Sequence, residues 1–98
     1  MTIDVKKENG TVFMTVCGRL DTTTAPALDK AIEEKVQNEK HLVLDVAGME
    51  YISSAGLRVL LTAQKKMMKL GSMTVKNVRE EIMDIFEMTG FADILTIE

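Results

Sequence analysis

The segment Tyr51–Leu57 holds the residues whose types and spacing most suggest chemistry. Ser53 and Ser54 stand between an apolar run typical of a buried strand and the regular apolar spacing of an amphipathic helix. In open α/β sheets, ligand chemistry gathers at the carboxyl ends of the strands. A serine at this point can cap the helix, attack a substrate as a nucleophile, or accept a phosphoryl group.

Helix capping is the structural explanation of these serines and requires no function. A serine side chain at the N-cap accepts a hydrogen bond from a free backbone N–H and stabilises the helix by about 1 kcal/mol relative to alanine. Capping preferences alone would therefore account for Ser53 or Ser54 at this place.

Catalysis by Ser54 is disfavoured because a nucleophilic serine needs a base. The chain has one histidine, His41, which begins the strand leading to this segment and is expected at the opposite edge of the sheet. The segment also lacks the G-x-S-x-G spacing of a nucleophile elbow. We expect no catalytic residue and no enzymatic activity.

Phosphorylation of Ser54 is the remaining functional interpretation. A phosphate adds a charge of about −1.5 to −2 together with strong acceptor oxygens. At the start of a helix it meets free backbone N–H groups and the positive end of the helix dipole. The modified protein would stay folded while its surface charge changed, which makes a switch without catalysis.

Composition limits the other classes of function. The chain has 98 residues, 46% of them hydrophobic, and a net charge of −3, values that fit one folded domain over residues 1–98. A single cysteine, Cys17, excludes an internal disulfide and a Cys-rich metal site. The acidic balance argues against nucleic acid, and no apolar run approaches a membrane span. We expect a cytoplasmic domain without membrane insertion, metal or cofactor.

The pattern of the chain predicts five strands and three helices in the order ββαβαβαβ. Strands are expected over 2–7, 11–17, 41–46, 73–78 and 94–97, and helices over about 24–38, 53–70 and 79–89. The Asn9-Gly10 pair predicts a hairpin turn, Thr24 and Pro26 a helix start, and Gly71 a helix end. Residues 48–52 are expected to be a connection.

This order predicts an α/β fold with a mixed β-sheet, because strands that alternate with helices pair in parallel through right-handed crossovers. The run HLVLDV is nearly continuous and apolar, which is typical of a strand covered on both faces. Leu44, Val46, Leu57, Leu60 and Leu61 are expected to form the core beneath the Ser54 segment.

Three segments of the chain together resemble the STAS domain, and specifically the bacterial anti-sigma-factor antagonists. They are GRLDTTTAPAL, HLVLDVAGMEYISSAGLRVLL and REEIMDIFEMTGF. Each segment alone is weakly specific, whereas the three at these spacings are quite specific, and the resemblance covers nearly the whole chain in the right order. The resemblance implies a single STAS-type domain, with helices packed mainly on one face of a mixed sheet.

The resemblance also implies a function and its residues. Such an antagonist binds an anti-sigma factor that is also a serine kinase, and so releases the sigma factor. Phosphorylation of one serine, matched here by Ser54, ends binding, and a PP2C-type phosphatase restores it. The implied partner-binding residues are Asp21, Thr22, Thr23, Ser53, Ser54, Ala55, Gly56 and Leu57.

Ser53 departs from the family pattern, since many antagonists carry aspartate at that place. The change removes a local negative charge and leaves open whether Ser54 is phosphorylated. An alternative is therefore a STAS subunit that is never modified and forms a structural or regulatory part of a transporter or signalling assembly. The Ser54 segment would then be a docking surface only.

Overall fold

The computed structural model describes residues 1–98, and its elements confirm an α/β fold with a mixed sheet. The strands are β1 (Thr2–Glu8), β2 (Thr11–Leu20), β3 (His41–Asp45), β4 (Met49–Ile52) and β5 (Ser72–Lys76). The helices are α1 (Ala25–Lys35), α2 (Ser54–Leu70), α3 (Glu80–Thr89) and α4 (Phe91–Ile94). The helix α1 ends three residues before the predicted boundary at position 38, and Val36 is its C-cap.

The sheet has the strand order β1-β2-β3-β5, with β4 paired to the far end of β2. The β1–β2 pair is antiparallel, and all other pairs are parallel. The hairpin turn falls at Asn9 and Gly10, whose φ angles of 48° and 80° are both left-handed. This is the geometry that an Asn-Gly pair accommodates best, so the predicted hairpin is confirmed.

The second strand continues beyond Cys17, where the prediction ended it. Gly18 has a φ of 98°, and the pairing register shifts between Gly18 and Arg19. This bulge redirects β2 from β3 to β4, so residues 49–52, predicted to be a connection, form a strand instead. The four residues of β4 show no alternation of buried and exposed positions that would predict a strand, and the partner strand lies about thirty positions earlier in the chain.

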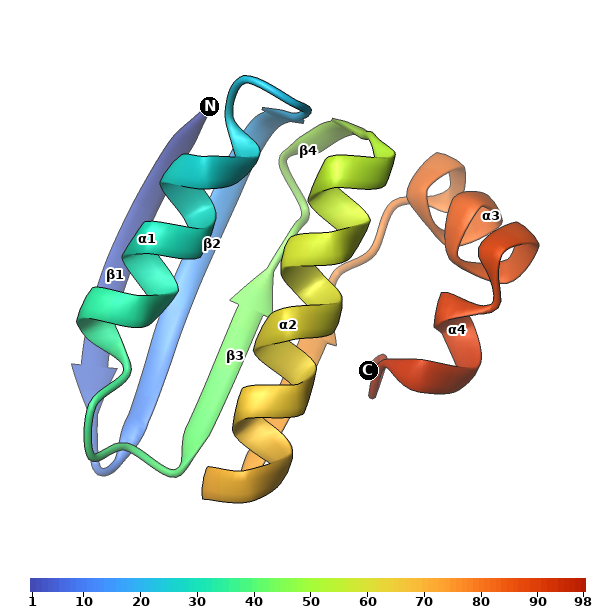
Figure 1. Ribbon diagram of the computed structural model, residues 1–98. Coiled ribbons are helices and arrows are strands. Elements are labelled where there is room, and N and C mark those ends of the chain that lie inside the picture. The colour runs from blue at the N-terminus through green and yellow to red at the C-terminus, as the bar shows by residue number, and fades with distance from the viewer.

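One face of the sheet is covered by α1 and α2, and the other face is open (Figure 1). Leu42 and Leu44 of β3 point to the helices and are buried, whereas His41 is exposed and Val43 and Asp45 are half-buried. The prediction that β3 is covered on both faces is therefore wrong. Packing of the helices mainly on one face is confirmed, with α3 and α4 beyond the β5 edge (Figure 1).

The core beneath the start of α2 is nearly as predicted. Leu44, Val46, Leu57 and Leu60 are buried, with Leu60 fully inaccessible. Leu61 is only half-buried, because it lies about 100° around the helix from Leu60, just outside the buried face of α2.

The C-terminal residues differ from the prediction of a strand over 94–97. Gly90, with a φ of 83°, ends α3, and the chain then forms the short helix α4. Beyond α4, only one parallel bridge joins Ile97 to Val75. Only Ile94 of the predicted strand lies in α4, and the three residues after it form this single bridge instead of a strand.

Candidate functional site

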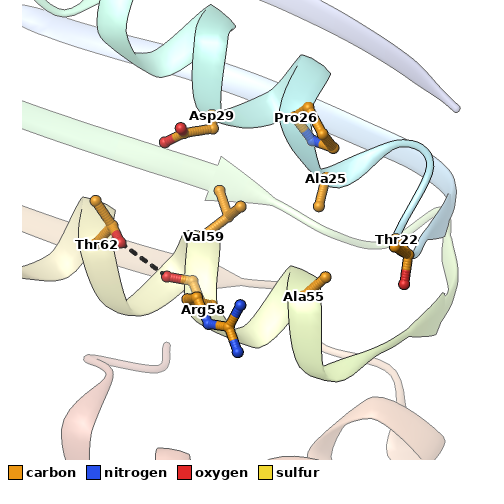
Figure 2. Close-up of a pocket in the computed structure, with 8 residues that line it drawn as sticks. All are labelled: Thr22, Ala25, Pro26, Asp29, Ala55, Arg58, Val59 and Thr62. Atoms are coloured by element: carbon orange, nitrogen blue, oxygen red, sulfur yellow. Dashed lines mark hydrogen bonds between the residues drawn. The ribbon is translucent and has the colours of Figure 1, made fainter.

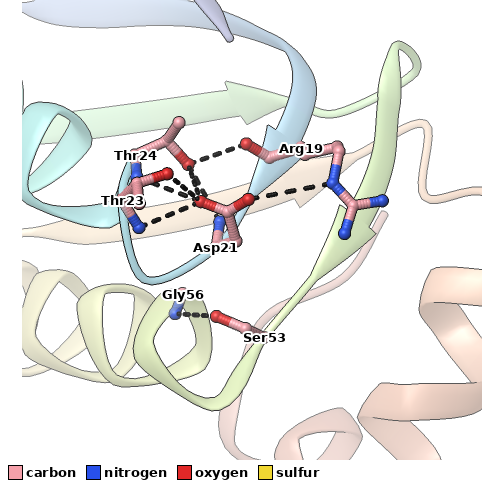
Figure 3. A network of polar contacts seen from close by, with 6 residues as sticks. All are labelled: Arg19, Asp21, Thr23, Thr24, Ser53 and Gly56. Carbon is pink, nitrogen blue, oxygen red and sulfur yellow. Dashed lines mark hydrogen bonds and ion pairs between the residues drawn. The ribbon is translucent and has the colours of Figure 1, made fainter.

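The end of β2 and the start of α2 lie side by side at one end of the sheet. Leu20 and Ile52 are parallel neighbours, and the Ser53 N–H donates to the Leu20 carbonyl at 2.9 Å. The loop that begins at Asp21 and the helix that begins at Ser54 therefore leave neighbouring strands at the same end (Figure 3). The fold brings together two segments that are more than thirty residues apart in the sequence.

Gly56 is the residue that permits this close approach. A Cβ atom at Gly56 would lie 2.8 Å from the Leu20 side chain and 2.9 Å from both the Leu20 carbonyl oxygen and the Ile52 side chain. A backbone oxygen cannot give way as a side chain can. The Gly56-Leu57 pair therefore has a structural explanation. Gly56 leaves room for the close contact with Leu20 and Ile52, and the buried Leu57 side chain fixes the first turn of α2 in the core.

Ser53 is the N-cap of α2. Its backbone is extended, and its Oγ accepts a long hydrogen bond of 3.4 Å from the Gly56 N–H. The side chain is half-buried against the loop. Serine and aspartate are similarly good N-caps. Ser53 therefore fills the capping role of an aspartate at this position, without the negative charge of the carboxylate.

Ser54 is the first residue of α2, and it is exposed. Its hydroxyl takes part in none of the hydrogen bonds of the structure, in contrast to the hydroxyls of Ser53, Thr23 and Thr24. The first turn of α2 contains no acidic side chain. An accessible hydroxyl thus stands at the positive end of a 17-residue helix, without an internal partner or a nearby helical carboxylate.

Asp21 organises the neighbouring loop. Its Oδ1 accepts hydrogen bonds from the Thr23 hydroxyl at 2.7 Å, the Thr23 N–H at 3.0 Å and the Thr24 N–H at 3.1 Å (Figure 3). Its Oδ2 lies 3.7 Å from Nε of Arg19. The Thr23 hydroxyl is the main cause that lowers the pKa of Asp21 below its ordinary value, and the two backbone N–H groups add to it. Asp21 is therefore a charged residue that shapes the loop.

The predicted partner-binding residues form one region of the structure, although they differ in exposure. Thr22, Thr23 and Ser54 are exposed, and Asp21, Ser53 and Ala55 are half-buried. Gly56 and Leu57 are buried. These last two residues support the surface from beneath and cannot supply much contact area.

Two arginines near this surface were missed by the sequence reasoning. Arg19 is paired with Tyr51 across β2 and β4, and its guanidinium lies 4.2 Å above the centre of the Tyr51 ring. Arg58 lies one helical turn after Ser54. The four-residue spacing from Ser54 to Arg58 was a readable signal, whereas the Arg19–Tyr51 contact depends on a strand pair that the sequence did not predict.

A shallow pocket of about 270 Å³ lies between α1 and α2, and Ala55 in the first turn of α2 is part of its lining (Figure 2). Its walls come from the loop after β2, the first turns of α1 and the first half of α2. The lining residues are Thr22, Ala25, Pro26, Asp29, Ala55, Arg58, Val59 and Thr62.

His41 lies at the other end of β3, as predicted. Its Nδ1 is 2.7 Å from the Ser72 hydroxyl on the neighbouring strand, so the histidine and Ser54 belong to different ends of the sheet. The His, Cys, Asp and Glu side chains form no group of three or more suited to a metal ion. None of the helices combines the length and the apolar character needed to cross a membrane.

The STAS domain family model matches residues 2–98. The chain belongs to the STAS domain family. Its geometry agrees with this assignment. A crystal structure of an anti-sigma factor antagonist from Mycobacterium paratuberculosis superposes with a TM-score of 0.88 at 28% identity, over 98% of this chain and 83% of that one.

Two relatives by sequence have names of the same kind. The anti-sigma-B factor antagonist of Bacillus subtilis is 26% identical over 99% of this chain and 90% of its own length. The anti-sigma-F factor antagonist RsfB of Mycobacterium tuberculosis is 36% identical over 67% of this STAS chain and 55% of its own length. The family resemblance deduced from the sequence is confirmed.

Proposed function

We propose that this STAS domain is an anti-sigma factor antagonist switched by phosphorylation of Ser54. It binds an anti-sigma factor that is also a serine kinase, and the sigma factor is released. The observation that carries the proposal is the Ser54 hydroxyl, which is exposed, free of internal hydrogen bonds and placed beside the Asp21 loop. The relatives named as antagonists support the class of partner.

Ser54 is a better phosphoacceptor than its neighbours. The hydroxyl of Ser53 is half-buried and caps α2, while the hydroxyls of Thr23 and Thr24 donate to Asp21 and to the Arg19 carbonyl. A kinase that modified these groups would have to break local structure. Modification of Ser54 breaks no hydrogen bond.

The folded state tolerates a phosphate at Ser54. The helix dipole favours a negative charge in the first turn by about 0.3–1 kcal/mol at a surface site. The Asp21 carboxylate on the next loop opposes this, while Arg19 partly offsets its charge. These effects nearly cancel, so phosphorylation should leave the stability of the domain almost unchanged.

The complex does not tolerate the same phosphate. A docked partner removes water from the Ser54 surface, and desolvation of a nearly doubly charged group that the partner does not neutralise costs several kcal/mol. Since 1.4 kcal/mol corresponds to a tenfold change in affinity, phosphorylation should end binding. A PP2C-type phosphatase then returns the domain to its binding form, and the domain itself turns over no substrate.

The alternative of an unmodified structural subunit drew its support from Ser53 in place of aspartate. The structure gives Ser53 a capping role that either residue fills. This capping role supports the switch, because it accounts for serine at position 53, and the alternative becomes an outcome of the experiment.

Mass spectrometry of the protein recovered from cells tests this proposal. We expect phosphate on Ser54, with occupancy that rises when the phosphatase is inhibited, and none on Ser53 or Thr23. The proposal fails if Ser54 stays unmodified under both conditions, and the structural-subunit alternative then stands.

A further inference from the structure

Arg58 carries a charge that the structure leaves unused. Its side chain is exposed, and its guanidinium takes part in none of the five ion pairs. Its backbone carbonyl accepts a hydrogen bond from the Thr62 hydroxyl at 3.0 Å, and no hydrogen bond of the structure uses its guanidinium. As the fifth residue of α2, Arg58 lies beyond the first turn, where the helix dipole acts, and gains nothing from that dipole. Its place in α2 thus has no explanation within the domain itself.

Ser54 and Arg58 are neighbours on the surface of α2, because residues four apart lie on one face of a helix with Cβ atoms about 5–6 Å apart. Side chains in helices also lean toward the N-terminus, over the preceding turn. Figure 2 shows the Arg58 side chain extended toward the turn that contains Ala55. The guanidinium is directed toward the end of the helix at which Ser54 stands.

The other charged groups around this surface do not compete for Arg58. Asp29 lines the same pocket from α1, yet its carboxylate is directed away and forms no ion pair with Arg58 (Figure 2). Arg19, the other cation nearby, stacks on Tyr51 and faces Asp21. Arg58 is therefore the cation that is free to contact a new anion on Ser54.

We propose that Arg58 binds the phosphate of phosphorylated Ser54 within the same domain. The inference deepens the proposed function and takes Ser54 as its site. A planar guanidinium presents parallel N–H donors that match two phosphate oxygens. The phosphate is then held against the first two turns of α2, where a partner would dock. Because Arg58 contacts the phosphate, its guanidinium is no longer available to that partner. Both changes act against binding.

The experiment uses the full chain with phosphoserine inserted at position 54 during translation, so that no kinase is needed. The probe is the phosphate itself, whose second pKa is followed by ³¹P NMR. The variants are Arg58→Gln, which removes the charge, and Arg58→Lys, which retains it. Lys65→Gln is the matched control, since Lys65 is an exposed cation of α2 about three helical turns from Ser54.

A cation beside the phosphate favours its doubly charged form, so loss of Arg58 should raise the phosphate pKa. We expect the proton affinity of the phosphate to rise about two- to fivefold in Arg58→Gln, the range of exposed ion pairs. Arg58→Lys should show a smaller rise, and Lys65→Gln none. The rise should shrink at high salt.

An unchanged phosphate pKa in Arg58→Gln overturns the inference. A rise in Arg19→Gln without one in Arg58→Gln also overturns it, because the phosphate would then be held by the other arginine. The titration tests only the contact between Arg58 and the phosphate, since the phosphoserine is inserted during translation. The proposed function is tested separately and fails if Ser54 is unmodified in cells. The unphosphorylated Arg58→Gln protein should keep its thermal midpoint, since the structure gives its guanidinium no partner.

Discussion

The backbone N–H of Ser53 donates to the carbonyl of Leu20 at 2.9 Å and thereby ties the start of α2 to the end of β2. This bond continues the β2–β4 pairing by one residue beyond the strands. It brings the Asp21 loop and Ser54 into one surface. The proposed switch depends on this arrangement, because each loop alone offers only part of the surface.

Replacement of Gly56 by alanine should disturb this arrangement. The added Cβ would lie 2.9 Å from the Leu20 carbonyl oxygen, and overpacking of this kind costs about 1–3 kcal/mol. Thermal or urea unfolding should show the loss. Ser54→Ala is the matched control, since it alters an exposed side chain of the same turn and should stay within about 0.5 kcal/mol. Equal stability of the two variants would show that α2 lies farther from Leu20.

Leu60→Ala should destabilise the domain by about 2–5 kcal/mol, because Leu60 is fully buried between α2 and the sheet. A small domain has only about 5–15 kcal/mol of total stability, so partner binding would then fail through unfolding. Met68→Ala is the comparison, since Met68 is 71% exposed on the same helix. A Leu60→Ala protein with an unchanged thermal midpoint would contradict the helix register.

Glu39 should contribute a pH-dependent part of the stability. The Gln37 N–H donates to its carboxylate at 2.9 Å, and Nζ of Lys7 lies 3.3 Å away. These contacts, the Gln37 N–H foremost, lower the pKa of Glu39 from 4.5 to about 2. Because the folded pKa is depressed, the contribution is complete above pH 4.5 and is lost as pH falls toward 2.

Glu39→Gln should therefore be less stable than the wild type at neutral pH, and the difference should vanish near pH 2. Urea unfolding across this range measures it. Glu50→Gln, which changes an exposed carboxylate without an ion pair, is the control. If the difference in unfolding free energy between wild type and Glu39→Gln stayed constant from neutral pH to pH 2, the contacts assigned to Glu39 would be refuted.

Gln64 is the buried polar residue of the core, 8% exposed, and its Oε1 has no hydrogen-bond partner. A buried acceptor without a partner costs about 1–3 kcal/mol. Gln64→Met, which keeps the shape of the side chain, should raise the thermal midpoint. Lys65→Met at the exposed neighbouring position should have little effect. A fall in stability of Gln64→Met would show that the oxygen is satisfied in solution.

The sequence was sufficient where local patterns decide the structure. The Asn9-Gly10 turn, the apolar face of α2 and the end of that helix at Gly71 follow from backbone preferences and 3.6-residue spacing. The Ser54 segment could be placed at the carboxyl end of a strand for the same reason. Its neighbour, the Asp21 loop, came from the family resemblance.

The sequence was insufficient where contacts between residues far apart in the chain decide the structure. The bulge at Gly18 and the pairing of β4 with β2 arise from contacts between segments about thirty residues apart, so β4 was mistaken for a connection. The short helix α4 was not predicted, because its four residues are too few to show a helical spacing, and it replaces the start of the strand predicted over 94–97. The distinction between Ser53 as the cap and Ser54 as the free hydroxyl also required the geometry of the turn.

The most direct test of the central claim is the affinity of the domain for an anti-sigma factor kinase of its source organism, measured by calorimetry. The wild type, Ser54→Ala, Ser54→Asp and the protein with phosphoserine at position 54 are compared. We predict that wild type and Ser54→Ala bind equally, and that the two charged forms bind at least about a hundredfold more weakly, the effect of several kcal/mol. Equal affinity of the wild type and the phosphoserine protein would contradict the switch.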